Sequence, residues 1–477
     1  MSRRRSLALV LALAASASAC AVGPDYQRPE LPTTPTFRDH GADAATVADS
    51  AWFDVFGDPV LRKLVDEALA NNRDLQAAIA RVEQARYFAA VARSPLLPQI
   101  GYDTVATRGS HSFLDLPTAG GSGAGNAFLA IANMSWEIDL WGRIRRSAES
   151  SRADMLASDA VRRGVVLSLV SGIATAYFEL RELDLELEIA HDSVASFQET
   201  FDLFNRRYHG GVASKLDPLR AQAALAQVAA LVPDTENRIV AKENEISVLL
   251  GRPAQATERG TALVDQALPP EVPAGVPSQL LERRPDLMEA EQNLVSANAE
   301  IGASFANYFP RVGLTAVGGA VSAELSNLLK GSSSLWSIGA EAAGPLFTAG
   351  RTTYEWRAAQ AATDAARASY EGAVLNALRE VSDALTAREK LRSVRADEEQ
   401  QVKALAESLD TARVRYSGGL ATYIEVLDAQ QQLYPAQLSL AQTRRDELLA
   451  VVELYRALGG SWSQSANELE IPLPLAP

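Results

Sequence analysis

The sequence predicts a mixed, mainly α protein built from two tandem structural repeats, each with long antiparallel helices and two β-strands. The phrase RYSGGLATYIEVLDAQ at 415–430 nearly repeats RYHGGVASKLDPLRAQ, which lies 208 residues earlier at 207–222. Each half also contains one very long stretch of helical apolar spacing and two segments of alternating polarity. A period this long exceeds that of a solenoid repeat, so it indicates two structurally equivalent halves.

The N-terminal residues have the features of an export signal that ends at a cysteine. Three successive arginines precede an apolar stretch too short to span a bilayer, and small residues lead to Cys20, the only cysteine. Residues 1–19 are therefore predicted to be a signal peptide and Cys20 to carry a thioether-linked lipid. An incidental cysteine beside an ordinary cleavage site is the alternative. Ala21 follows Cys20, which in a bacterial lipoprotein favours the outer membrane.

The charge of the chain argues against a nucleic-acid partner. The formal net charge is −14, and loss of the three signal arginines takes it to −17, whereas phosphates require a basic face. A solvated acidic surface explains such a balance, and acids that line a pore would favour cations. We expect no interior apolar run long enough for a transmembrane helix.

The helical elements follow the same order in both halves. The expected elements are a helix at 74–96 and 286–308, two strands, a long helix at 143–208 and 351–416, and a second helix at 214–250 and 422–458. At about 1.5 Å per residue, the long helix would reach roughly 100 Å, which no compact globule contains. Gly210-Gly211 and Gly418-Gly419 then supply the left-handed caps of two hairpin turns. Apolar spacing and small residues alone fit an ordinary antiparallel coiled coil as well as a hollow bundle.

The alternating segments predict four strands, at 99–108, 127–140, 311–320 and 335–345. The second of these has an apolar face and a face that ends in Glu137 and Asp139, and the fourth sets Trp336 and Ile338 against Glu341. This is the pattern of a transmembrane barrel with the three acids in its lumen, although a soluble amphipathic sheet shows the same alternation. Four strands cannot close a barrel, and open edges in lipid are costly, so several chains must share one.

Catalytic chemistry has little support in the sequence. The four histidines have no metal-ligand spacing, and neither a GxSxG motif nor a phosphate-binding glycine loop occurs. We therefore predict no catalytic residue, no metal and no cofactor beyond the lipid on Cys20. A structural coiled-coil lipoprotein of the envelope without a pore is the alternative function, and four amphipathic strands argue against it. A nutrient porin would lack the long helices.

The order of several phrases resembles the TolC-like family of bacterial outer-membrane efflux channels, in particular the lipoprotein branch similar to OprM and NodT. The phrases span nearly the whole mature chain. They are CAVGPDYQRPELP (20–32), WFDVFGDPVLRKLVDEALANNRDL (52–75), ERRPDLMEAEQNLVSANAEIGASFANYFP (282–310), GPLFTAGR (344–351), RYSGGLATYIEVLDAQ (415–430) and YRALGGSW (455–462).

The resemblance implies a homotrimer in the outer membrane whose three chains share a 12-stranded β-barrel and an α-helical barrel through the periplasm. Its partners would be a periplasmic adaptor protein and an inner-membrane pump, and the channel itself would do no chemistry. The implied domains are an acylated extension and belt segment at 20–73, the first repeat at 74–250, a belt linker at 251–281, the second repeat at 282–458, and a belt tail at 459–477.

The resemblance also implies a gate and a contact surface at the hairpin turns. Matched residue by residue, Glu425 and Asp428 would form an acidic ring at the periplasmic entrance, with Ile424 as an apolar constriction; acids that merely complement the helix dipole are the alternative. In the first repeat Asp217 and Arg220 take the acidic positions. The adaptor would contact both turns through Gly210, Gly211, Val212, Gly418, Gly419 and Leu420.

The sequence departs from the family in the residues that lock the entrance. Ala421 replaces an arginine of TolC itself, and Gln431 replaces an arginine of OprM-like members. The locking bonds therefore cannot be carried over from the family. Side chains beside the turns are the remaining candidates, namely Arg207, Tyr208, Arg415 and Tyr416.

Overall fold

The computed structural model of the chain describes residues 21–31, 56–109, 125–267 and 280–460, which fall into two compact units. Unit 1 takes its residues from 21–31, 80–159 and 289–371, and unit 2 from 56–79, 160–288 and 372–460. The predicted signal peptide, Cys20, and the C-terminal tail from 461 onward lie outside the described residues.

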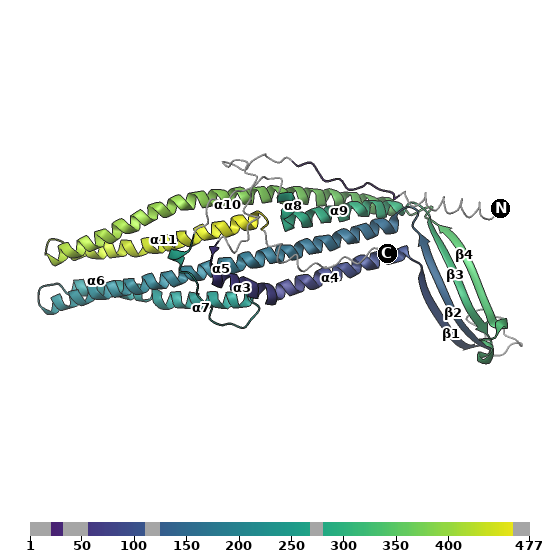
Figure 1. Cartoon of the computed structure of the whole chain (residues 1–477), viewed down its shortest axis with the longest axis horizontal. Helices are drawn as coiled ribbons and strands as arrows, with labels where there is room; N and C mark the ends of the chain where they lie inside the picture. The colour runs from purple at the N-terminus through teal and green to yellow at the C-terminus, as the bar shows by residue number, and fades with distance from the viewer. Residues whose placement is uncertain (1–20, 32–55, 110–124, 268–279, 461–477) are drawn as a thin grey trace. The chain divides into compact units, whose positions relative to one another are not determined.

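Unit 1 contains a four-stranded antiparallel sheet in the order β1-β2-β3-β4 (Figure 1). The strands are β1 (Gln99–Gly109), β2 (Gly125–Ile138), β3 (Arg311–Ser322) and β4 (Ser334–Ala343). All four predicted strands are confirmed, with ends that differ by no more than a few residues. Strands β2 and β3 come from different halves of the chain and pair over eleven residues, so the sheet joins the two repeats.

The strand register aligns small side chains between two aromatic ones. Tyr102 on β1 lies opposite Ala132 on β2, which lies opposite Gly318 on β3 and then Trp336 on β4. Tyr102 and Trp336 stand on the two edge strands and are 82% and 78% exposed in the single chain. Because side chains alternate between the faces of a sheet, this row shares its face with the other apolar residues of the strands.

The two long helices are α5 (Arg143–His209) and α10 (Arg351–Ser417), each of 67 residues. Each follows a glycine with positive φ, Gly142 at 78° and Gly350 at 87°, a conformation that favours glycine. The shorter α4 (Arg73–Arg93) and α9 (Pro285–Ala306) precede the strands of the two repeats. These four helices confirm the prediction within a few residues.

The second helices of the two repeats differ. The second repeat has one continuous helix, α11 (Tyr423–Ala457), whereas the first has α6 (Leu216–Ala229) and α7 (Leu231–Leu249). The prediction of one helix at 214–250 was wrong at Ala230. Pro233 has no N–H to donate to the carbonyl of residue 229. Pro435 lies inside α11 without interrupting it, so the proline alone does not explain the difference.

The remaining regular elements are short. Helix α3 (Pro59–Asn71) and helix α8 (Leu280–Arg283) belong to unit 2. Single 3₁₀ turns occur at η2 (Ser94–Leu96), η3 (Leu263–Asp265), η5 (Leu325–Asn327) and η6 (Gly331–Ser333).

The largest hydrophobic core lies in unit 2, where α3, α5, α7 and α11 meet. Its fully buried members include Tyr177 and Leu180 of α5, Ile246 of α7 and Leu448 of α11. One window of α5 is apolar enough, with a mean hydropathy of 1.2, to pass for a membrane span, contrary to our expectation. Because 61% of that window is buried within the chain, packing in this core accounts for its apolar character.

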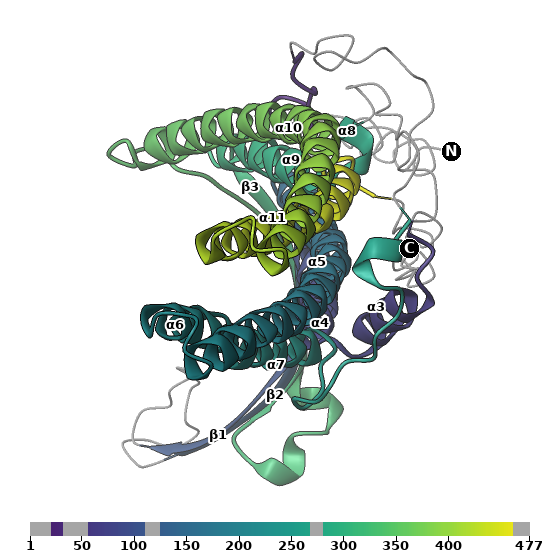
Figure 2. The same cartoon turned by 90° about the vertical axis from the view of Figure 1, so that its left-hand side faces the viewer.

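Both hairpin turns are Schellman caps. In the first, the N–H of Gly211 donates to the Tyr208 carbonyl at 2.9 Å, and the N–H of Val212 to the Arg207 carbonyl at 3.0 Å. The second turn repeats this with Gly419 and Leu420, and both central glycines have positive φ, 75° and 72°. Figure 2 shows the two helix pairs, α5–α6 and α10–α11, that these turns connect, and both turns lie in unit 2.

Substitution of one glycine in the second turn tests this cap. Gly419→Ala should lower the free energy of unfolding by about 1–2 kcal/mol, because alanine in the left-handed region is strained although a Cβ there meets no atom within 4 Å. Gly418→Ala is the matched control, since Gly418 is not in that region and its Cβ would make only an ordinary contact. Urea unfolding followed by circular dichroism measures both, and equal effects would contradict the assignment.

Candidate functional site: hairpin turns and strand face

Helix α11 begins at the second turn with a capping box. Thr422 is the N-cap, its side chain accepts from the N–H of Glu425, and the N–H of Thr422 donates to the Glu425 carboxylate at 3.2 Å. Arg415 of α10 lies 3.6 Å from the same carboxylate and also donates to the Leu420 carbonyl at 3.4 Å. Glu425 therefore has a local structural role in the cap of α11, and its charge has a cationic neighbour.

Asp428 lies one turn further along and plays no part in the cap. It is exposed and accepts a hydrogen bond from the Gln432 amide at 2.7 Å. Ile424 is 60% exposed on the adjoining surface. A groove of about 440 Å³ between α10 and α11 has Glu407, Arg415, Glu425 and Asp428 in its wall, so three carboxylates share it with one guanidinium.

The turn of the first repeat offers a different surface. Asp217 lies in the first turn of α6, where its N–H donates to the Ser214 carbonyl. Val212 in this turn and Leu420 in the second are 71% and 77% exposed. Each hairpin tip thus presents an apolar side chain directly after its left-handed glycine.

Three aromatic rings connect the two hairpins near their turns. The ring of Phe204 on α5 lies 3.9 Å from that of Tyr423 on α11 and 5.5 Å from that of Tyr416 on α10, centroid to centroid. The Arg207 guanidinium lies over the Tyr416 ring at 4.9 Å, a cation–π distance. Two of the side chains suspected from the sequence, Arg207 and Tyr416, therefore meet, whereas the contribution of Phe204 and Tyr423 was not predicted.

A second connection between the hairpins is polar and buried. The amide of Gln430 on α11 donates to the Ser196 hydroxyl at 2.7 Å and the Thr200 hydroxyl at 3.1 Å, both on α5. Arg413 of α10 donates to the same Ser196 hydroxyl at 2.6 Å. The network thus ties three helices together two residues after Asp428.

Two of the three acids predicted for the lumen lie on one face of the sheet. Glu137 on β2 and Glu341 on β4 both lie beside Gly313 of β3 in the register, so they share one face. Glu137 accepts two hydrogen bonds from Arg143, at 3.1 and 2.8 Å, and Glu341 is exposed.

The placement of Asp139 in the lumen is corrected by the structure. Strand β2 ends at Ile138, and the Asp139 carboxylate accepts from the N–H groups of Ile144 and Arg145 at 3.1 and 2.9 Å. It thereby satisfies two free donors at the start of α5. Its side chain is 7% exposed, so Asp139 serves as a helix cap.

A strap formed by residues 21–31 was not predicted. Arg28 in the strap makes two hydrogen bonds to Glu291 of α9, both 2.7 Å, and the Tyr26 hydroxyl adds a third at 3.0 Å. At the other end, Ala21 contacts Gly142, and an added Cβ on Gly142 would lie 2.7 Å from the Ala21 Cβ. The feature of the sequence that could have indicated this contact is the small size of Ala21 and Gly142, which lets the two segments approach closely.

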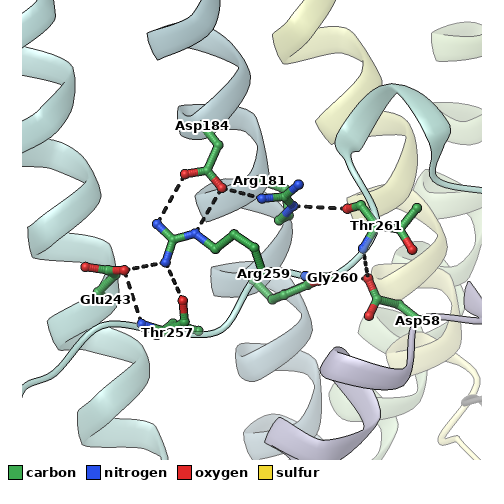
Figure 3. Close-up of polar contacts among 9 residues, drawn as sticks. Asp58, Arg181, Asp184, Glu243, Thr257, Arg259, Gly260 and Thr261 are labelled. Atoms are coloured by element: carbon green, nitrogen blue, oxygen red, sulfur yellow. Dashed lines mark hydrogen bonds and ion pairs between the residues drawn. The ribbon is translucent and has the colours of Figure 1, made fainter.

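The described part of the expected belt consists of α3 and residues 251–267, which lie against α5 and α7 (Figure 3). Arg259 bonds to Asp184 of α5 at 3.1 and 3.2 Å and to Glu243 of α7. The Tyr177 hydroxyl donates to Asp58, the N-cap of α3, at 2.7 Å. These ionic contacts hold the segment after α7 in place.

The comparison with known families agrees with this arrangement of strands and hairpins. Residues 64–252 and 276–460 match the sequence model of the outer membrane efflux protein family. The chain belongs to this family. Outer membrane efflux proteins form an α-helical barrel joined to a shared β-barrel, and this chain has the helices and strands of that fold.

Relatives and a solved structure extend the comparison. The chain is 30% identical to the cation efflux system protein CusC of Escherichia coli, over 93% of this chain and 96% of that protein. It is 33% identical to the toluene efflux pump outer membrane protein TtgF of Pseudomonas putida, over 94% and 95%. The open-state MtrE outer membrane channel of Neisseria gonorrhoeae is similar in structure, with a TM-score of 0.84, 29% identity, and 93% and 99% coverage.

The two acids of the second turn should differ in their effect on stability. Glu425→Ala removes half of the capping box and should lower the free energy of unfolding by about 1 kcal/mol. Glu425→Gln keeps an acceptor for the Thr422 N–H and should cost less, and Asp428→Asn should have no measurable effect. Guanidinium unfolding of the three variants provides the measurement. If Asp428→Asn lowered the free energy of unfolding as much as Glu425→Ala does, the assignment of different roles to the two acids would be wrong.

Proposed function

We propose that this outer membrane efflux protein is the homotrimeric exit duct of a tripartite efflux or secretion system. The observation that carries the proposal is the open sheet. Within the described residues, β1 and β4 each pair on one side only, and these edge strands belong to a chain with two long helical hairpins. An envelope protein that served only as a coiled-coil tether would have no use for such a sheet.

The geometry of the sheet supports closure by further copies. Because four strands alternate in direction, β1 and β4 are antiparallel, so β4 of one copy can pair with β1 of the next without a break in the pattern. Ile100 on β1 and Ile338 on β4 are each 78% exposed in the single chain, as expected of lipid-facing or subunit-facing positions. Three copies would give a 12-stranded barrel, within the range of outer-membrane barrels.

The start of the mature chain supports a lipid anchor on Cys20. The N–H of Val22 donates to the Trp141 carbonyl at 3.0 Å, and Trp141 lies between β2, which ends at Ile138, and α5. Trp141 stacks on Phe309 at 4.6 Å, and Phe305 and Trp356 continue the cluster. Aromatic residues favour the membrane–water interface, so an acyl chain that precedes Ala21 would enter the membrane at the level where the strands do.

We assign the entrance gate to Asp428 and Ile424, with Glu425 in a supporting role. Asp428 is exposed and has no cation within bonding distance among the described contacts, whereas Glu425 has Arg415 beside it. In a trimer, three Asp428 carboxylates near one axis would repel one another and attract cations.

The hairpin tips are the proposed contacts for a periplasmic adaptor. Their exposed apolar residues, Val212 and Leu420, would otherwise remain in water. An inner-membrane pump would supply the energy, and the duct would carry out no chemical step. Similar proteins are named for cations and for toluene, so we propose that the pump, and not this duct, selects the substrate.

Single-channel recording of the purified full-length protein in a planar bilayer tests the duct. We expect a trimer by light scattering in detergent and a small, cation-preferring conductance. A monomer that conducts no ions would overturn the proposal and favour the tether.

Comparison of two charge variants tests the gate. Asp428→Asn should reduce cation preference and increase conductance, because it removes one carboxylate per chain from the entrance. Glu425→Gln removes the same charge but should change selectivity less, because the proposal places Asp428, and not the Glu425 carboxylate held in the cap of α11, at the entrance. If both variants conduct as the unmodified protein does, the duct stands and the gate assignment fails.

A further inference from the structure

Two glutamates on α5, Glu182 and Glu186, lie one helical turn apart inside unit 2. Their residues are only 2% and 4% exposed, although charged side chains are seldom buried this fully unless they are paired. They lie between α7 of the first hairpin and α11 of the second. Neither belongs to the proposed gate, the strand face or the belt contacts.

Each glutamate has one arginine partner from a different helix. Arg238 of α7 donates to Glu186 at 2.7 Å, and Arg445 of α11 lies 3.3 Å from Glu182. Gln442 of α11 donates to the other Glu186 oxygen at 3.4 Å. Arg445 is shared, however, because it also makes hydrogen bonds of 2.9 and 2.7 Å to Asp446. The charge available to Glu182 is thus reduced.

The remaining charged or titratable neighbours do not compensate. Glu179, one turn before Glu182, is paired with Lys242 of α7 at 2.8 Å. Tyr434 of α11 lies near the Glu186 carboxylate. Burial and the charge of that carboxylate raise the pKa of Tyr434. Oε1 of Glu182 is buried and accepts no hydrogen bond from another described group.

We infer that Glu182 holds a proton beside the Glu186 carboxylate and that the two residues act as a proton-operated joint between the two hairpins of the chain. With the proton, the pair carries one negative charge, and the Glu182 hydroxyl hydrogen-bonds to the Glu186 carboxylate. Without it, two adjacent carboxylates repel one another in a dry interior, and the contact of α5 with α7 and α11 loosens. No bond other than that of this proton changes.

Electrostatics place the transition in an accessible pH range. Burial, followed by the hydrogen bond and the charge of Glu186, raises the pKa of Glu182 from 4.5 to about 7. A shift of this size corresponds to a roughly 300-fold preference of the folded chain for the proton. Since the folded pKa lies above the unfolded one, the group causes no loss of stability below about pH 4.5, and the loss grows as the pH rises through about 7.

Infrared spectroscopy of the full-length protein detects the proton directly. A protonated buried carboxyl has a C=O stretching band distinct from that of a carboxylate, and this band should disappear between about pH 6 and 8. Glu182→Gln should abolish the band, whereas Glu179→Gln, a matched change one turn away at a solvated ion pair, should leave it. In Glu186→Gln the band should disappear at a lower pH, because the repelling charge of Glu186 is gone while both arginines remain.

Hydrogen exchange measures the mechanical consequence. After correction for intrinsic rates, amides of α7 and α11 near the pair should exchange roughly tenfold faster at pH 8 than at pH 6. Glu182→Gln should remove this dependence, and Glu179→Gln should retain it. If Glu182→Gln does not fold, Glu186→Gln still tests the proposal through the pH at which the C=O band disappears. A protein without the band, or with the same pH response in Glu182→Gln and Glu179→Gln, would overturn the proposal.

Discussion

Backbone hydrogen bonding at the edges of the sheet constrains the molecule more than any single side chain does. In hydrocarbon, each unpaired N–H or C=O costs several kcal/mol, and strands β1 and β4 each leave one row unpaired within the described chain. The eleven-residue pairing of β2 with β3 joins the two repeats, so one chain contributes four strands. An even number of antiparallel strands lets identical copies close a barrel, and this is the constraint on which the proposed trimer rests.

The long elements could be predicted from the sequence because their signals are repetitive. The apolar spacing of α5 and α10 continues over many turns, and the alternation in β2 continues over more than ten residues, so local exceptions do not obscure either. The interruption at Ala230 was missed because it affects a single residue within a long helical pattern. The strap was also missed: Arg28 and Glu291 are 263 residues apart, and no local pattern reports so distant a pair.

The acidic residues show where prediction by residue type fails. Asp139, Glu425 and Asp428 are all carboxylates near the end of an element. In the structure Asp139 caps α5 and Glu425 closes the capping box of α11, whereas Asp428 projects into the groove without a capping role. Which role a carboxylate takes depends on whether free N–H groups lie within about 3 Å, and that distance is set by the turn before it. The family resemblance indicated where functional acids occur in the chain, whereas the hydrogen bonds in the structure distinguish the acids that cap helices from the one that does not.

The strap also depends on the assembly of both repeats. Its partners come from both repeats. Ala21 lies against Gly142 at the start of α5, a Cβ on Gly23 would clash with the backbone of Gly302 in α9, and Arg28 bonds to Glu291. These surfaces exist together only after the first and second repeats have packed. Docking of the strap therefore requires that the helices at this end are already assembled, because a chain in which only the first repeat has folded lacks Glu291 and Gly302 as its partners.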